Sequence, residues 1–102
     1  MKNRVYELEE LIGEKLIILL PALKVRKEIL WNEFDDLFVY LEEVKELTNG
    51  KETITRSLAY KLFQCYFEVD RQFNLIENEQ KKDLQSRLFM SIVSILNDHQ
   101  FY

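Results

Sequence analysis

Apolar residues recur along residues 21–48 with the spacing of a packed helix. Five of them are separated alternately by four and three positions, which is the two-per-heptad pattern of helices that pack side by side. They are Leu30, Phe34, Leu37, Leu41 and Val44, and Trp31 and Phe38 widen the same face. Acidic residues repeat every seven positions on the other side, at Glu28, Asp35 and Glu42. The pattern predicts one long amphipathic helix with a solvated acidic face.

Three further segments show helical periodicity. A first helix is predicted over residues 3–19, a third over 53–73 and a fourth over 78–97. Their apolar stripes comprise Val5, Leu8, Ile12, Leu16 and Leu19 in the first, Ile54, Leu58, Leu62, Cys65, Val69 and Phe73 in the third, and Leu84, Leu88, Ile92 and Ile95 in the fourth. Asn49 and Gly50 mark the end of the second helix, because both tolerate the left-handed conformation that closes many helices. We expect a single all-α domain spanning residues 1–102.

Pro21 leaves two arrangements of the N-terminal half open. Proline suits the first position of a new helix and disfavours helical geometry in the residue before it, here Leu20. The favoured interpretation is a break at this point, which gives an antiparallel four-helix bundle. In the alternative, one long first helix continues to residue 48 with a kink at Pro21, which gives three helices. A monomer of this size cannot cover so long a helix, so the alternative requires a dimer.

The charges of the predicted second helix oppose its dipole. Basic residues crowd its positive amino end and acidic residues crowd its negative carboxyl end. They are Lys24, Arg26 and Lys27 at the first, and Glu42, Glu43 and Glu46 at the second. The third helix carries Arg56 and Lys61 in its first half, and folding it back would bring these cations to the acidic end. We therefore predict that the second and third helices form an antiparallel hairpin.

Composition narrows the class of protein. The 102 residues include only two glycines and one proline, far fewer turn-forming residues than an all-β fold needs. The longest apolar run, residues 16–23, is too short for a membrane-spanning helix, which takes about 20 residues. The charged start is not followed by the apolar run of a secretory leader. Cys65 is the single cysteine and cannot form an internal disulfide. We expect a cytoplasmic protein without membrane association.

Candidate catalytic and metal-binding residues are few. His99 is the one histidine and lies in the C-terminal tail, without a neighbour that could orient it as a general base. Cys65 lies on an apolar stripe, where a small core residue is typical. Paired carboxylates such as Glu42 and Glu43 lack the Glu-x-x-His spacing of carboxylate-bridged metal sites. We therefore expect no catalytic residues, no metal and no cofactor.

Aromatic residues give the strongest indication of function. The predicted third helix carries Tyr60, Phe63 and Phe67 on a second apolar face, and aromatic residues are enriched at protein interfaces. The end of the predicted first helix is apolar on all sides. The expected interface comprises Leu16, Leu19, Leu20, Leu23, Tyr60, Phe63 and Phe67. We expect a homodimer and a non-enzymatic module that binds another protein, such as a small bacterial or phage regulator, inhibitor or immunity-type protein.

The alternative function is that of a nucleic-acid-associated regulator. Basic residues on the predicted third and fourth helices are candidates for phosphate contacts. They are Arg56, Lys61, Lys81, Lys82 and Arg87. The net charge of −4 and the acidic residues between these cations make nucleic acid the less favoured partner. No stretch of the chain resembles the motif of a known family.

Overall fold

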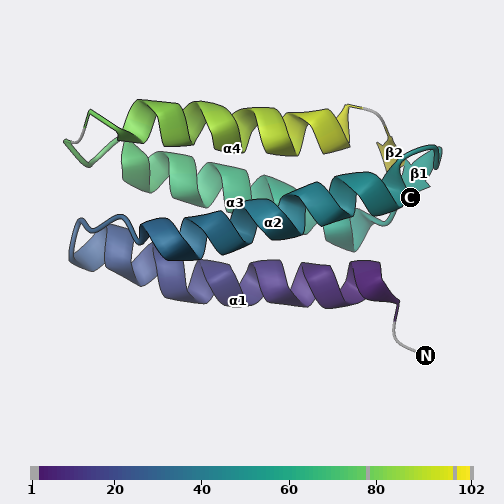
Figure 1. Ribbon diagram of the computed structural model, residues 1–102, viewed down its shortest axis with the longest axis horizontal. Helices are drawn as coiled ribbons and strands as arrows, with labels where there is room; N and C mark the ends of the chain where they lie inside the picture. The colour runs from purple at the N-terminus through teal and green to yellow at the C-terminus, as the bar shows by residue number, and fades with distance from the viewer. Residues whose placement is uncertain (1–2, 78, 98, 102) are drawn as a thin grey trace.

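The computed structural model describes residues 3–77, 79–97 and 99–101. Within them the chain forms four packed helices and two very short strands (Figure 1). The elements are α1 (Arg4–Val25), α2 (Trp31–Thr48), β1 (Thr53–Ile54), α3 (Arg56–Phe73), α4 (Lys81–Leu96) and β2 (Gln100–Phe101). The predicted all-α class is confirmed. The predicted start of the last helix at Asn78 lies outside the described residues, and the helix is observed from Lys81.

Consecutive helices alternate in direction along the long axis of the molecule (Figure 1). The extensive contacts join α1 to α2, α1 to α3, α2 to α4 and α3 to α4. The first and last of these pairs are antiparallel, whereas α1 runs in the same direction as α3, and α2 in the same direction as α4. The consecutive helices α2 and α3 therefore lie on a diagonal of the molecule. Helices α1 and α4 therefore each pack against both α2 and α3.

Pro21 lies inside α1, which continues to Val25. Both interpretations of this residue are therefore wrong, since the chain neither breaks at Leu20 nor continues as one helix to residue 48. Pro21 is exposed, so the backbone hydrogen bond that it cannot donate is lost on the solvent side. The next two residues, Ala22 and Leu23, are fully buried and hold the last turn against the core.

Helix α1 ends at a left-handed residue. Lys27 has φ 54°, and the amide N–H groups of Arg26 and Glu28 donate to the carbonyl oxygen of Ala22 at 3.2 and 3.0 Å. The sequence suggested this closing geometry for Asn49 and Gly50, of which Gly50 is the one other described residue with a positive φ. Ile29 is buried and anchors the connection to α2.

The later start of α2 removes the conflict between charge and dipole at its amino end, whereas Glu42, Glu43 and Glu46 still lie near its negative carboxyl end. Lys24 lies in the last turn of α1, and Arg26 and Lys27 follow it, so these cations adjoin the negative end of α1. The first turn of α2 instead carries Glu33, which suits its positive end. The basic cluster was assigned to the wrong helix because the helix boundary was placed at Pro21 rather than at residues 26–30.

The predicted hairpin between α2 and α3 is also wrong. Glu43 of α2 pairs with Arg4 of α1, not with Arg56 or Lys61. Lys61 lies over α1, where its Nζ is 3.3 Å from the position that a Cβ on Gly13 would occupy. The absence of a side chain at Gly13 thus makes room for this lysine. The physical reason for the error is that α3 packs beside α1, so that Lys61 lies over α1 rather than over the acidic end of α2.

The core is built from the predicted apolar stripes. All six stripe residues of the third helix and all four of the fourth are buried, as are Leu8, Ile12, Leu16 and Leu19 of α1. In α2 the buried face comprises Phe34, Leu37, Phe38, Leu41 and Val44. The rings of Phe34 and Phe73 stack at 5.5 Å between centroids and join α2 to α3 across the molecule. Trp31 remains partly exposed at the start of α2.

Two short strands close one end of the molecule. Residues 53–54, predicted as the first turn of the third helix, instead form β1, which pairs in parallel with β2. Helix α3 begins at Arg56, where the hydroxyl of Thr55 accepts a hydrogen bond from the amide of Leu58 at 3.2 Å. Ile54 is buried. The chain after α4 therefore returns to the segment between α2 and α3.

Candidate protein interface on helices α3 and α4

An exposed row of aromatic rings runs along α3 and crosses to α4. We define the aromatic surface as Tyr60, Phe63, Tyr66, Phe67, Phe89 and Met90. Tyr60 and Phe67 expose 70% and 62% of their surface, and Met90 exposes 65%. These are large apolar side chains that the core of the chain leaves in contact with water. Contiguous apolar surface of this kind marks interaction sites on many proteins.

The rings of this surface contact one another. Phe63 and Phe67 stack at 6.0 Å between centroids with an interplanar angle of 10°. Tyr66 stacks on Phe67 at 5.4 Å and meets the ring of Phe89 edge-on at 5.5 Å. Ring pairs in these geometries attract one another beyond the effect of area burial. The contacts hold four side chains in one continuous arrangement across two helices.

Helix α3 is fixed below the rings by its buried face. The spacing of 3 and 4 that places Tyr60, Phe63 and Phe67 together on the outside places Leu62, Cys65 and Val69 in the core. Because the inner face is held by packing, the outer face presents its rings on a rigid helix.

Polar bonds fix α4 against α3. The amide of Gln85 donates to Asp70 Oδ1 at 3.1 Å, and Lys81 Nζ donates to the carbonyl oxygen of Phe73 at 2.9 Å and to that of Ile76. Lysine thus caps the carboxyl end of α3, where carbonyl groups lack helical partners. These bonds set the relative position of the two helices that carry the aromatic surface.

The predicted interface residues separate into two groups. Leu16, Leu19 and Leu23 are core residues of the chain itself, which corrects their assignment to a surface that a partner can reach. Leu20 is half-buried. Tyr60, Phe63 and Phe67 are exposed, and their role in binding stays a prediction. The leucines are buried because α1 extends past Pro21 and packs along its whole length.

Two exposed residues of the aromatic surface were not predicted as interface residues. Phe89 and Met90 follow the buried Leu88 and lie outside the core stripe of α4. Their offset from the stripe is visible in the sequence, but only the packing of α3 on α4 shows that they lie beside Tyr66. Ile17 belongs to the end of the first helix that was predicted to be apolar on all sides, and it exposes 74% of its surface.

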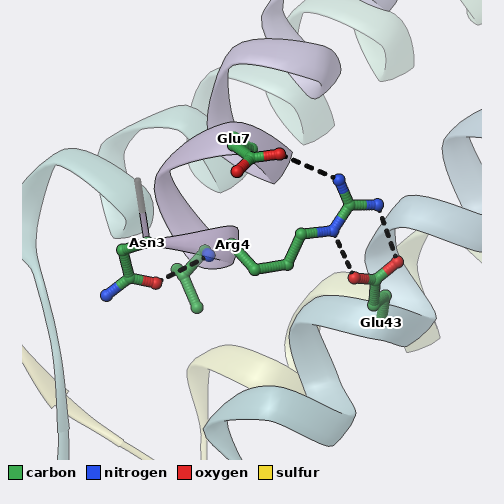
Figure 2. Close-up of polar contacts among 5 residues, drawn as sticks. Asn3, Arg4, Glu7 and Glu43 are labelled. Atoms are coloured by element: carbon green, nitrogen blue, oxygen red, sulfur yellow. Dashed lines mark hydrogen bonds and ion pairs between the residues drawn. The ribbon is translucent and has the colours of Figure 1, made fainter. Parts of the chain in front are cut away.

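Ion pairs bridge α1 and α2 on their side of the molecule, where Tyr6 and Trp31 also expose 51% and 42% of their surface. Figure 2 shows Arg4 between Glu7 and Glu43, with Nη2 donating to Glu43 Oε1 at 3.0 Å and Nη1 donating to Glu7 at 3.2 Å. The hydrogen bonds from Arg4 lower the pKa of the Glu43 carboxyl. The amide of Val5 donates to the side chain of Asn3, which caps the helix at 2.8 Å.

A second ionic group lies further along the same pair of helices. Lys15 Nζ contacts the carboxylate of Glu33 and donates to Asp36 Oδ2 at 3.1 Å. The hydrogen bond to Glu33 is the main cause of a raised pKa for Lys15. The two groups of ion pairs bridge α1 and α2 at both ends of their contact, which is consistent with their antiparallel direction.

Cys65 and His99, the two side chains considered for catalysis, lie in contact with other parts of the fold. Burial in the core raises the pKa of the Cys65 thiol to about 12, so the nucleophilic thiolate is strongly disfavoured. His99 is half-buried rather than on the open surface, and its ring lies 2.7 Å from the carbonyl oxygens of both Ile95 and Thr48. Both residues are therefore engaged within the fold.

The basic residues considered for nucleic-acid contacts face different parts of the chain. Lys61 lies over α1, Lys81 caps α3, and the guanidinium of Arg87 lies 4.0 Å above the ring of Phe38 of α2. The side chains of Lys61, Lys81 and Arg87 thus each contact another part of the same chain. They do not gather into one basic face with the remaining two, Arg56 and Lys82.

Comparison of the chain with protein-family models, curated proteins and solved structures finds no match. Among the described residues, no group of three or more His, Cys, Asp or Glu side chains is placed to hold a metal ion. Within the same part of the chain, every helix is too short or too polar to cross a membrane. The aromatic surface is therefore the feature of the described structure that most clearly calls for a function.

Proposed function

We propose that the protein is a non-enzymatic four-helix module, with consecutive helices antiparallel, that binds another protein through the aromatic surface. It would act as a small regulator, inhibitor or immunity-type protein of bacterial or phage origin. A cytoplasmic location belongs to the same proposal and rests on the single cysteine. The observation that carries the proposal is the row of stacked, exposed rings from Phe63 to Phe89.

The energetics of association support this use of the rings. Aromatic side chains dominate the binding energy of many interfaces, because they bury a large area at a small cost in side-chain entropy. The contacts among the rings restrict them before a partner arrives, which reduces the ordering cost of binding further. Tyr60 and Tyr66 also carry hydroxyl groups, which give the surface polar contacts for specificity.

We further propose that one occupant of this surface is a second copy of the chain, in a two-fold homodimer. Two-fold symmetry is the most frequent solution for small oligomers, and it requires a self-complementary surface. Stacked rings meet this requirement because a ring can pack against its own symmetry mate. Leu16, Leu19 and Leu23 have no part in this contact, because they belong to the core.

Sedimentation at micromolar concentration tests the dimer. The wild-type chain should sediment at twice its mass of 12.4 kDa, and Phe67→Ser should weaken the association about tenfold or more. Val39→Ser is the matched control, because Val39 lies on α2 and exposes the same 62% of its surface as Phe67. A wild-type monomer would reject the homodimer. Equal effects of the two substitutions would reject the aromatic surface as the contact.

Binding to a different protein needs its own measurement. Affinity capture from the source organism with the wild-type chain and the Phe67→Ser variant should yield a partner that is enriched only with the wild type. The Val39→Ser variant should retain it. Retention on heparin that falls as salt increases, without such a partner, would instead support the nucleic-acid alternative.

A further inference from the structure

His99 joins the carboxyl ends of two helices. Its Nδ1 lies 2.7 Å from the carbonyl oxygen of Ile95 in the last turn of α4, and its Nε2 lies 2.7 Å from that of Thr48, the last residue of α2. These helices run in the same direction, so both carboxyl ends lie at the same end of the molecule (Figure 1). The carbonyl groups of a last helical turn have no helical N–H partner, and a side-chain donor satisfies them.

The chemistry of the two contacts selects one protonation state. A carbonyl oxygen only accepts hydrogen bonds, so each ring nitrogen must donate to complete its contact. Neutral imidazole has a single N–H, whereas imidazolium has two. The negative ends of both helix dipoles also favour a positive charge at this position. Hydrogen bonding and the dipoles therefore act in the same direction.

We propose that His99 acts as an imidazolium clasp that holds the end of α4 and strand β2 to the end of α2, and that loss of its proton loosens this attachment. The clasp lies directly before β2, which pairs with β1 and adjoins the buried Ile54. Opening would uncover the edge of β1. Because only the protonated ring can donate to both carbonyl oxygens, the attachment is stronger with the imidazolium than with the neutral ring.

Charged groups near the ring are close to balanced. The hollow that His99 lines, about 540 Å³ in volume, also contains side chains of α2 and of the connection to β1. The charged ones are Glu42, Lys45, Glu46, Lys51 and Glu52. Ser94 and Ile95 of α4 carry no charge, and Asp98 lies outside the described residues. Three carboxylates and two ammonium groups therefore line the hollow together with the ring of His99.

The state of the ring can be observed directly, because His99 is the only histidine of the chain. Long-range ¹H–¹⁵N spectra of the wild-type protein should show both ring nitrogens protonated in mildly acidic buffer, and one protonated in mildly alkaline buffer. At each pH the retained N–H should show the slow exchange of a hydrogen-bonded proton. A mixture of neutral tautomers in the mildly acidic buffer would overturn the proposal without any substitution being made.

The effect on the strands is measured by backbone amide exchange in β1 and β2. Protection, expressed relative to the intrinsic exchange rate at each pH, should fall roughly three- to tenfold between about pH 5.5 and pH 8 in the wild type. His99→Gln and His99→Lys should remove this change, because neither side chain changes charge in that range. Their helical circular dichroism checks the fold. Equal pH dependence of wild type and variants would overturn the clasp.

Discussion

The two pairs of antiparallel helices both expose apolar side chains, but they differ in the contacts that join their outer side chains. The α1–α2 pair is bridged by ion pairs, with Arg4 joining Glu7 to Glu43 and Lys15 contacting Glu33. The α3–α4 pair presents stacked rings, with Tyr66 meeting Phe89 across the two helices. Both pairs share one buried core. The difference therefore lies in the outer surfaces of the two pairs rather than in how each is held in the fold.

The comparison separates stability from recognition. Exposed ion pairs contribute little free energy of unfolding, but their hydrated charges oppose close apolar contact with another protein. Exposed rings also contribute little to the fold, but they release ordered water when a partner covers them. The proposed function therefore assigns the contact with a partner to the stacked rings of α3 and α4 rather than to the ion pairs of α1 and α2.

The largest expected effect concerns the core that the two pairs share. Phe34→Ala removes the ring that stacks on Phe73 and should lower the free energy of unfolding by about 4 kcal/mol. Urea unfolding followed by circular dichroism measures it. Trp31→Ala is the control, since Trp31 starts the same helix but is partly exposed, and its effect should be clearly smaller. Equal losses would mean that the pairs do not depend on a common core.

A smaller effect is expected at the junction of α3 and α4. Lys81→Met keeps most of the side-chain length but removes the donor to the carbonyl oxygens of Phe73 and Ile76. The free energy of unfolding should fall by about 2 kcal/mol, because a charged hydrogen-bond donor is lost from partly buried carbonyl groups. Lys82→Met, at the exposed neighbouring position, should leave it nearly unchanged. If both variants unfold alike, the lysine cap does not fix the aromatic surface.

The ion pairs of the α1–α2 side should contribute less to the free energy of unfolding than the hydrogen bonds of Lys81 do. Lys15→Met should lower the free energy of unfolding by at most about 1 kcal/mol. High salt should reduce the difference between the wild type and the variant, because it screens the attraction to Glu33 and Asp36. Thermal unfolding at low and high salt checks this. A loss that is unaffected by salt would indicate packing by the lysine stem rather than charge.

The smallest effect is the acid response of the Arg4–Glu43 pair. Arg4 lowers the pKa of Glu43 in the folded chain. The pair therefore stabilises the fold at pH values above 4.5, the ordinary pKa of this carboxyl group. That contribution is lost as the pH falls through the lowered pKa of the folded state. Arg4→Gln should therefore narrow the difference in stability between neutral and acidic buffer. An unchanged acid response in the variant would show that the pair is not populated in solution.

Periodicity predicted the interior of this protein well. The stripes of α3 and α4 are buried as expected, because an amphipathic helix packs its apolar stripe against the core to remove it from water. Tyr60, Phe63 and Phe67 were recognised as a second face, and they are exposed. These features depend on the spacing of residues within one helix, which can be read directly from the sequence.

The errors concern the ends of helices and the choice of neighbours. Pro21 suggested a break, but burial of Ala22 and Leu23 outweighs one lost hydrogen bond on the solvent side. The helix closes at Lys27, a residue type without a preference for a positive φ. Arg4 was not matched to Glu43, because charges on separate helices identify a partner only after the packing is known.

The parallel packing of α1 on α3 has a consequence for synthesis of the chain. Contacts such as those of Glu9 with Ser57 and of Gly13 with Lys61 join residues 48 positions apart. A ribosome adds about 5–20 residues per second, so α1 spends seconds without the neighbour that covers one of its flanks. Pairing of α1 with α2 is possible once Thr48 has emerged. During translation the α1–α2 pair therefore becomes available first, α3 next and α4 last.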